Sequence, residues 1–197
     1  MTAVPDTDPR AGTDTGADAD GAALAASLRD PERFTEIYDR HFAAVHRYVA
    51  GRLGPDAAED VVAETFLAAF RRRASFDAAR GAVRPWLFGI ATNLVAGHRR
   101  TETRRYRALA RVGAEPPAPG HEDGVLARVA AADARPGLSR ALAALKQRDR
   151  DVVLLVALGR LSHAEIAAAL GVPAGTVASR LNRARRELRA ALTPQGR

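Results

Sequence analysis

The chain has 197 residues, enough for one domain or two small ones, and it carries a net charge of +7 with no cysteine. Without cysteine it has no disulfide and no thiolate site for a metal ion or for redox chemistry. Residues 1–22 hold five aspartates and one arginine, so the rest of the chain carries +11, which favours a polyanionic partner. We expect a soluble cytoplasmic protein, because no secretion signal is present and the longest apolar run, 152–158, is far shorter than the ~20 residues of a membrane helix.

The N-terminal segment, residues 1–22, is predicted to be a disordered acidic tail, since it has too few apolar side chains to offset chain entropy. A long amphipathic helix follows. Asp30 before a proline indicates its start, and apolar residues recur at steps of three and four until Gly54. His41 and His46 on this helix lie about 140° apart around its axis, so they cannot chelate one metal ion together. Both histidines are expected to serve packing or to face solvent.

The next helix is predicted to begin with Asp56 as its cap and Glu59 three residues later. Its apolar stripe leaves Asp60, Glu64 and Leu67 together on an outer face. Two interpretations of this acidic face stay open at this point: a solvated helix surface, or a docking patch for a basic partner.

Residues 75–83 break the helical pattern and are predicted to form a loop, after which Pro85 opens another helix. Downstream, Arg99 and Arg100 begin a row of arginines that would form a basic stripe suited to phosphate contacts. No strand-like alternation occurs, so residues 24–111 are predicted to form an all-α domain. The proline-rich segment 112–136 is predicted to be a flexible linker.

The second predicted domain, 137–192, contains a helix-turn-helix. Its first apolar helix is expected to be capped by Asp149. Ser162 and Glu165 form a capping box, and Gly171 supplies the left-handed corner between two short helices, the second of which is rich in arginine. This combination is typical of a helix that reads the major groove of DNA, whereas the competing interpretation is an ordinary helical hairpin with a solvated basic face.

Four stretches, in this order, resemble conserved parts of the extracytoplasmic-function sigma factors, a group of the bacterial sigma-70 family. They are the helix Phe34–Tyr48, the run 58–67, Phe76-Asp77 followed by 84–94, and the run 175–185. The resemblance implies two helical domains joined by a linker. It also implies an alternative sigma factor that binds core RNA polymerase, recognises the −35 and −10 promoter elements and promotes promoter melting, with no catalytic residue, metal or cofactor of its own.

The resemblance assigns a role to each candidate residue. The residues that would dock on polymerase are Asp60, Glu64 and Leu67. The residues that would bind the −10 element are Phe76, Asp77, Arg80, Asn93, Arg99 and Arg100. The residues that would bind the −35 element are Thr176, Ser179, Arg180, Asn182, Arg183 and Arg186. The implied partners are the β′ and β subunits of core RNA polymerase, promoter DNA and an anti-sigma factor, which in this family is frequently anchored in the membrane. No small-molecule substrate is implied.

Three other functions compete with this one. A helix-turn-helix regulator that does not dock on polymerase would explain the C-terminal domain but not the acidic face at Asp60 and Glu64. A nucleic-acid enzyme would need a catalytic or metal-binding constellation, and the sequence offers none. A sigma-like decoy that docks on polymerase without opening promoters would share every motif described above.

Overall fold

A computed structural model describes residues 14–111 and 136–193, and these residues form helices joined by short turns. No strand occurs within these two ranges, as the sequence predicted. The elements are α1 (Asp14–Ala26), the 3₁₀ turn η1 (Pro31–Phe34), α2 (Thr35–Leu53), α3 (Pro55–Arg72), the 3₁₀ turns η2 (Arg73–Ser75) and η3 (Ala78–Arg80), α4 (Val83–Arg111), α6 (Pro136–Ala144), α7 (Gln147–Ala157), α8 (His163–Leu170) and α9 (Ala174–Leu192). None of the described helices is both long and apolar enough to cross a membrane.

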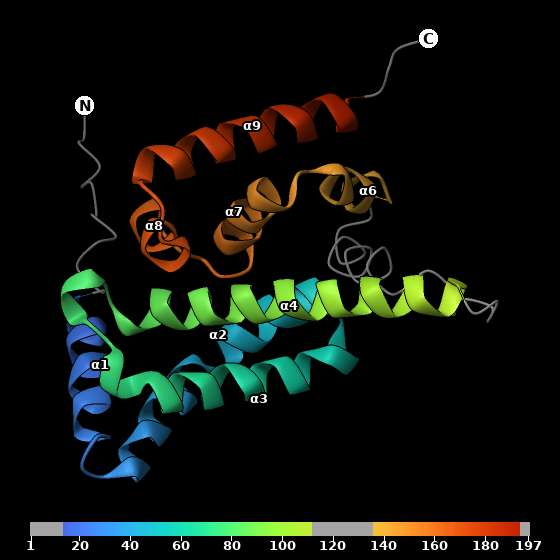
Figure 1. Cartoon of the computed structure of the whole chain (residues 1–197). Helices are drawn as coiled ribbons and strands as arrows, with labels where there is room; N and C mark the ends of the chain where they lie inside the picture. Colours follow the sequence, from blue (N-terminus) through green and yellow to red (C-terminus); the bar gives the residue numbers. More distant parts are fainter. Residues whose placement is uncertain (1–13, 112–135, 194–197) are drawn as a thin grey trace, which may run out of the picture.

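The N-terminal unit is built on a hairpin of α2 and α3 that packs beneath the long helix α4 (Figure 1). The hairpin turns at Gly54, whose φ of 92° a glycine adopts without steric cost, and Pro55 then occupies the first turn of α3. Asp30 accepts a hydrogen bond from the Glu32 backbone nitrogen at the entry to this hairpin, which confirms the predicted cap. The apolar faces of the three helices share one buried core.

Order begins earlier than the sequence predicted, because α1 starts at Asp14 rather than near Leu24. Ala23 and Leu24 are buried in the core of the N-terminal unit. Asp20, also buried, pairs with Arg40, and its carboxylate accepts a hydrogen bond from His41 Nε2 at 2.6 Å. These partners on α2 hold α1 in place. The sequence of α1 is only weakly apolar and does not by itself reveal these contacts.

Two predicted helix caps are wrong. Helix α3 begins at Pro55 with Gly54 as its cap residue, and Asp56 makes no capping hydrogen bond. Helix α7 begins at Gln147 after Lys146, which places Asp149 inside the first turn. In both cases an acidic residue near the helix start was read as the cap, although acidic side chains in the first turn are favourable without capping.

The C-terminal unit consists of α6 to α9. Ser162 and Glu165 form the predicted capping box at the start of α8, with both reciprocal hydrogen bonds present. Gly171 ends α8 in the left-handed conformation, at φ 62° and ψ 38°. Val177, Leu181 and Ala184 bury the inner face of α9, so the predicted helix-turn-helix is confirmed.

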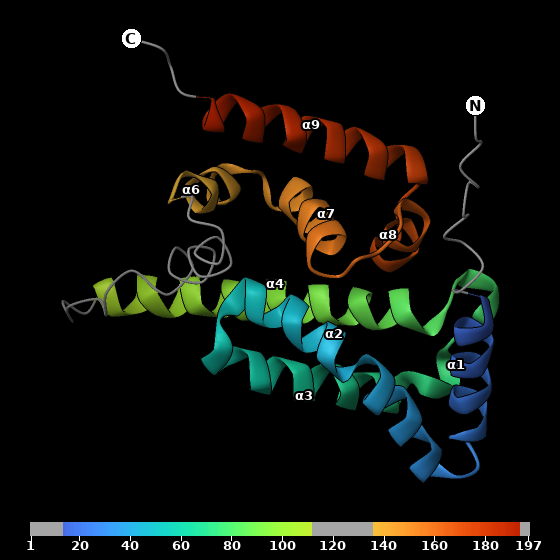
Figure 2. The ribbon, with the colours of Figure 1, turned by 180° about the vertical axis from the view of Figure 1, so that it is seen from behind.

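The two units pack directly on each other rather than lying apart. α4 lies between the α2–α3 hairpin and the C-terminal helices in both views (Figures 1 and 2). α8 contacts α4, and a single hydrophobic core joins Phe88 and Ile90 of α4 to Leu155 of α7 and Ile166 of α8. Most of the segment predicted as a linker lies outside the described residues. The tertiary structure therefore brings two predicted domains into one body.

Candidate nucleic-acid interface

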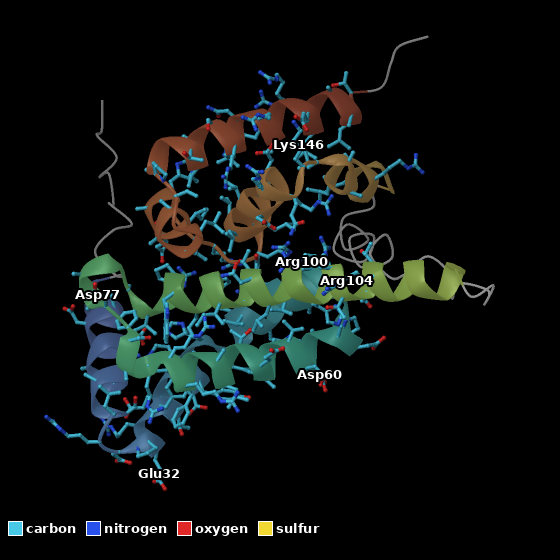
Figure 3. The ribbon with its side chains drawn as sticks, viewed as in Figure 1. Glu32, Asp60, Asp77, Arg100, Arg104 and Lys146 are labelled. Atoms are coloured by element: carbon cyan, nitrogen blue, oxygen red, sulfur yellow. The ribbon has the colours of Figure 1, made fainter. Side chains whose placement is uncertain are left out.

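The acidic face of α3 is exposed, as the helical pattern predicted. Asp60 and Glu64 are exposed, and Leu67 keeps 46% of its surface open to solvent. The opposite face of the same helix is buried, through Val61, Val62, Thr65 and Phe66 among others. Figure 3 shows Asp60 on the outer side of α3, away from α4. An exposed leucine next to two carboxylates forms an apolar and acidic surface that suits a basic protein partner.

A loop made of η2 and η3 joins α3 to α4 and shapes a cavity of about 510 Å³. Phe76 packs on Trp86 with ring centroids 5.1 Å apart, and Asp77 accepts a hydrogen bond from the Ala79 backbone nitrogen at 2.9 Å. The cavity is lined by Phe76, Asp77, Trp86 and Asn93, together with residues of α8 and of the turn that follows it. The structure therefore brings the predicted residues Phe76, Asp77 and Asn93 to one cavity.

Aromatic rings and polar side chains around one cavity can stack and hydrogen-bond a nucleobase that has left a duplex. Asn93 is exposed and offers both a donor and an acceptor. Arg80, also predicted for this site, ends η3, but its side chain lies outside the described part of the chain.

Arginines follow on the next turns of α4. Arg99 is half-buried and donates from Nη2 to the Arg52 carbonyl oxygen at 2.9 Å, whereas Arg100 is exposed. With Arg104, Gln147 and Arg150 they line a second cavity of about 500 Å³ between α4 and α7. Figure 3 shows Arg100 and Arg104 on the side of α4 that faces the C-terminal helices. This basic surface suits a phosphate backbone, and Arg99 additionally ties α4 to the end of α2.

The outer face of α9 presents the residues predicted to contact DNA. Ser179, Asn182, Arg183 and Arg186 are exposed, and Thr176 and Arg180 are half-buried. Ser179 Oγ donates to the Thr176 carbonyl oxygen at 3.0 Å, which orients the hydroxyl along the helix. Arg183 is also bonded to Asp149 of α7, so this arginine has a partner within the chain. Amide, hydroxyl and guanidinium groups in one row are the groups that read base edges.

The sequence analysis missed a buried polar chain that crosses the N-terminal unit. Arg52 Nη1 donates to the Tyr48 hydroxyl at 2.6 Å, Tyr48 bonds Thr92 at 2.8 Å, and Thr92 donates to the Phe88 carbonyl oxygen at 2.7 Å. Burial raises the pKa of the Tyr48 phenol, so this hydroxyl stays protonated. One signal was present in the sequence: Arg52 occupies a core position of the apolar stripe of α2.

Arg52 also reaches the C-terminal unit, where Nη2 lies 2.5 Å from Asp151 Oδ1. Burial by itself would lower the pKa of the Arg52 guanidinium, but its contacts with Tyr48 and Asp151 outweigh burial and raise that pKa. Arg84 at the start of α4 forms a second tie, with its Nη1 2.7 Å from Glu165 Oε1. No local pattern pairs residues this far apart in the chain.

Two known protein families match the chain, one in the N-terminal unit and one in the C-terminal unit. The family described as Sigma-70 region 2 matches residues 37–105, and Sigma-70, region 4 matches residues 137–188. The chain is 39% identical over 178 residues to the ECF RNA polymerase sigma factor SigL of Mycobacterium tuberculosis, covering 89% of this chain and 94% of that protein. It is 33% identical over 182 residues to the ECF RNA polymerase sigma factor BldN of Streptomyces coelicolor, covering 87% and 67%.

Solved structures resemble both units at once. CnrH in complex with the cytosolic domain of CnrY superimposes with a TM-score of 0.64 at 28% identity, over 90% of this chain and 99% of that one. The sigma factor RpoE in complex with the anti-sigma factor NepR from Bartonella quintana gives a TM-score of 0.60 at 23% identity, over 83% and 98%, and shares the fold.

Proposed function

Since the chain belongs to the extracytoplasmic-function sigma factors of the sigma-70 family, we propose which of its residues carry each step of transcription initiation. The protein is an alternative sigma factor: it binds core RNA polymerase, recognises −35 and −10 promoter elements and promotes promoter melting. A helix-turn-helix regulator that does not dock on polymerase is not favoured, because the region 2 match covers residues 37–105.

Docking on core polymerase is assigned to the acidic face of α3, formed by Asp60, Glu64 and Leu67. The single observation that supports this most is the combination of two exposed carboxylates with a half-exposed leucine on a helix whose other face is buried. A basic surface of the β′ subunit would complement this face, with the leucine supplying apolar contact at the centre.

The −10 element is assigned to the cavity before and along α4. A non-template base would leave the stack, enter beside Phe76, Asp77, Trp86 and Asn93, and be held there by stacking and hydrogen bonds. Arg100, and Arg80 in the loop, would contact the backbone of the opening strand. The −35 element is assigned to the outer face of α9, where asparagine suits adenine and arginine suits guanine.

The chain supplies binding energy and geometry, and the chemistry of RNA synthesis belongs to the polymerase. We assign it no catalytic residue and no cofactor. The units predicted at 24–111 and 137–192 are the two DNA-contacting domains, and 112–136 joins them. An anti-sigma factor is the expected regulator, like the anti-sigma factor NepR bound to RpoE, and would hold the protein in the cytoplasm or at the inner face of the membrane.

Pull-down with core RNA polymerase tests the docking assignment. Asp60→Arg combined with Glu64→Arg is expected to abolish binding of the full chain to core enzyme. Glu59→Arg is the matched control, because Glu59 is exposed on the same helix about 100° around the axis from Asp60. Binding that survives the double reversal, or that Glu59→Arg weakens equally, contradicts docking through this face. Run-off transcription with the assembled holoenzyme separates an active sigma factor from a decoy.

A further inference from the structure

The N-terminal helix α1 lies beside the loop that shapes the −10 cavity. In both views it stands next to the segment that joins α3 to α4, and it contacts η2 of that segment directly (Figures 1 and 2). α1 precedes residues 37–105, the range that matches Sigma-70 region 2, so its contacts rather than the family match indicate its role. Two sets of contacts are informative: those that fix α1 on the N-terminal unit, and one that joins its end to the loop.

α1 is fixed on the N-terminal unit by apolar burial and by charge. Ala23 and Leu24 are buried in the same hydrophobic core as the apolar faces of α2 and α3. The buried Asp20 carboxylate pairs with Arg40 and accepts a hydrogen bond from His41 Nε2, both on α2. A buried charge that loses its partner is strongly destabilising, so these pairs resist separation. α1 is therefore a firm support for any group bonded to its end.

The end of α1 is bonded to Arg73, the residue at which α3 gives way to η2. Arg73 Nε donates to the Ser27 carbonyl oxygen at 3.3 Å, and its Nη1 donates to the Phe70 carbonyl oxygen at 2.6 Å. Ser27 is fully buried and follows the last residue of α1, and Phe70 lies in the last turn of α3. Carbonyl groups at the end of a helix lack partners within the helix and carry partial negative charge. One guanidinium therefore joins the C-terminal ends of two helices.

An aromatic ring beneath this guanidinium fixes its place. Arg73 Cζ lies 3.7 Å from the centroid of the Phe70 ring, a cation–π contact. Phe70 in turn packs edge-on against Phe34, with ring centroids 5.3 Å apart and planes at 79°. Phe34 is buried, so the stack rests on the core of the N-terminal unit. Lysine would not reproduce this arrangement, because it lacks a planar fork with two directed donors.

The loop that follows Arg73 is internally bonded and leads directly to the −10 cavity. The Phe76 backbone nitrogen donates to the Arg73 carbonyl oxygen at 3.3 Å, and Ser75 Oγ donates to the Arg72 carbonyl oxygen at 2.8 Å. The Phe76 ring then packs on Trp86, and both line the cavity. Because Phe76 comes three residues after Arg73 and is bonded to its backbone, the place of Arg73 determines the place of the Phe76 ring.

We propose that α1 is part of the −10 site, and that Arg73 is the positioning residue through which α1 supports the loop. The Ser27 carbonyl group holds Arg73, Arg73 holds η2, and η2 places the Phe76 ring where a flipped base stacks. A loop already held in the receiving position binds a base without the entropy cost of ordering it. This inference rests on the proposed function for the identity of the cavity. The bond between α1 and the loop is a property of the free chain.

Fluorescence of Trp86 tests the positioning role in the free chain, because Trp86 is the only tryptophan of the sequence and packs on Phe76. Arg73→Lys keeps the positive charge but loses the fork, so acrylamide quenching of Trp86 is expected to increase at unchanged helix content. Phe76→Ala removes the ring and marks the upper limit of this increase. Arg71→Lys is the matched control, because Arg71 is exposed at the end of α3. Quenching that stays at the wild-type level in Arg73→Lys, or that rises equally in Arg71→Lys, overturns the positioning role.

A variant that weakens the anchor of α1 provides a second measurement. Asp20→Asn removes the charge that holds α1 on α2 and leaves Arg73 unchanged. It is expected to increase the quenching of Trp86 at a temperature at which the chain remains folded. Asp18→Asn, at an exposed position of the same helix, is the control and should quench like wild type. A wild-type level of quenching in Asp20→Asn contradicts the part assigned to α1.

Promoter opening by the assembled holoenzyme tests the consequence for function. Arg73→Lys is expected to slow the appearance of permanganate-reactive −10 thymines about tenfold, the factor that corresponds to one weakened charged hydrogen bond. Binding to core polymerase and to a −35 duplex should stay unchanged, and Arg71→Lys should open promoters like wild type. If Phe76→Ala leaves opening intact, the assignment of the cavity to the −10 base fails. If Phe76→Ala slows opening and Arg73→Lys does not, the positioning role fails, so the two failures are distinguishable.

Discussion

Arg183, on the helix assigned to the −35 element, donates hydrogen bonds from Nη1 to both carboxylate oxygens of Asp149, at 3.2 and 3.4 Å. The Asp149 side chain is only 1% exposed, whereas Arg183 is 43% exposed. The arginine therefore neutralises a buried carboxylate of α7 while its outer edge remains available to DNA. A single residue combines a stabilising role with a position on the face assigned to the −35 element.

Arg183→Ala is expected to weaken −35 binding and also to destabilise the C-terminal unit. The expected loss is on the order of 1–3 kcal/mol, because the Asp149 carboxylate stays buried without its partner. Thermal unfolding and a −35 duplex binding assay measure the two effects. Arg186→Ala, at an exposed position one turn further along the helix, serves as the control and is expected to weaken binding at unchanged stability. An Arg183→Ala protein that unfolds like wild type would refute the structural role.

Asn93→Ala is expected to slow promoter opening and leave duplex binding nearly unchanged. Asn93 lines the cavity assigned to the flipped base and lies on α4, whereas the residues assigned to the −35 element lie on α9. Permanganate reactivity of the −10 thymines in the holoenzyme complex measures opening. Asn182→Ala provides the contrast, since it should weaken −35 binding and leave opening of bound promoters intact. Interchangeable phenotypes would disprove the division of work between the two units.

Asp20 is expected to make the stability of the N-terminal unit sensitive to acid. Burial by itself would raise the pKa of the Asp20 carboxyl, but hydrogen bonds and charges from His41 and Arg40 outweigh it and hold that pKa below its ordinary value of 3.8. The folded pKa is below the unfolded one, so the stabilisation is complete above the ordinary value and is lost as the pH falls through the folded pKa.

Thermal unfolding of wild type and Asp20→Asn, followed by circular dichroism between about pH 3 and pH 7, measures this contribution. Wild type should be the more stable at neutral pH, and the difference should shrink as the pH falls below the ordinary carboxyl range. Asp18→Asn, exposed on the same helix, is the control and should show no such trend. A stability difference that is constant with pH would argue against an ionised Asp20.

Gly171→Ala is expected to cost about 1–2 kcal/mol of stability, because an L-residue with a side chain is strained in the left-handed conformation. No atom lies within 4 Å of a Cβ placed there, so steric contact contributes nothing. Gly175→Ala is the matched comparison in the same helix-turn-helix. It also has open space, but it lies in α9, where alanine should stabilise by about 0.5–1 kcal/mol. Melting temperatures that move in the same direction would show that backbone conformation does not govern this turn.

The features that the sequence predicted correctly are those whose causes are local. The capping box at Ser162 and Glu165 involves residues three apart, and the corner at Gly171 depends on one residue's backbone. The exposure of Asp60, Glu64 and Leu67 follows from helical periodicity, because the same helix buries its opposite face. Local chemistry was sufficient for the fold class, the helix-turn-helix and the order of the two units.

The features that sequence analysis missed depend on partners far along the chain. Arg84 meets Glu165 across 81 positions, and Asp20 meets His41 across 21, where no period of three or four applies. The error at Asp149 has the same origin, since this carboxylate pairs with Arg183 across 34 positions. The error at Asp56 is local, because an acidic residue in the first turn of a helix is favourable whether or not it caps.

By itself, the sequence determined an all-α chain with an exposed acidic face on one helix and a C-terminal helix-turn-helix, since capping, periodicity and turn chemistry act within a few residues. Only the tertiary structure decided that α1 is ordered from Asp14, that Arg183 neutralises Asp149, and that α8 packs closely on α4 at Gly89. These outcomes depend on close packing and on pairing buried charges, both of which need surfaces that meet only after the chain has folded.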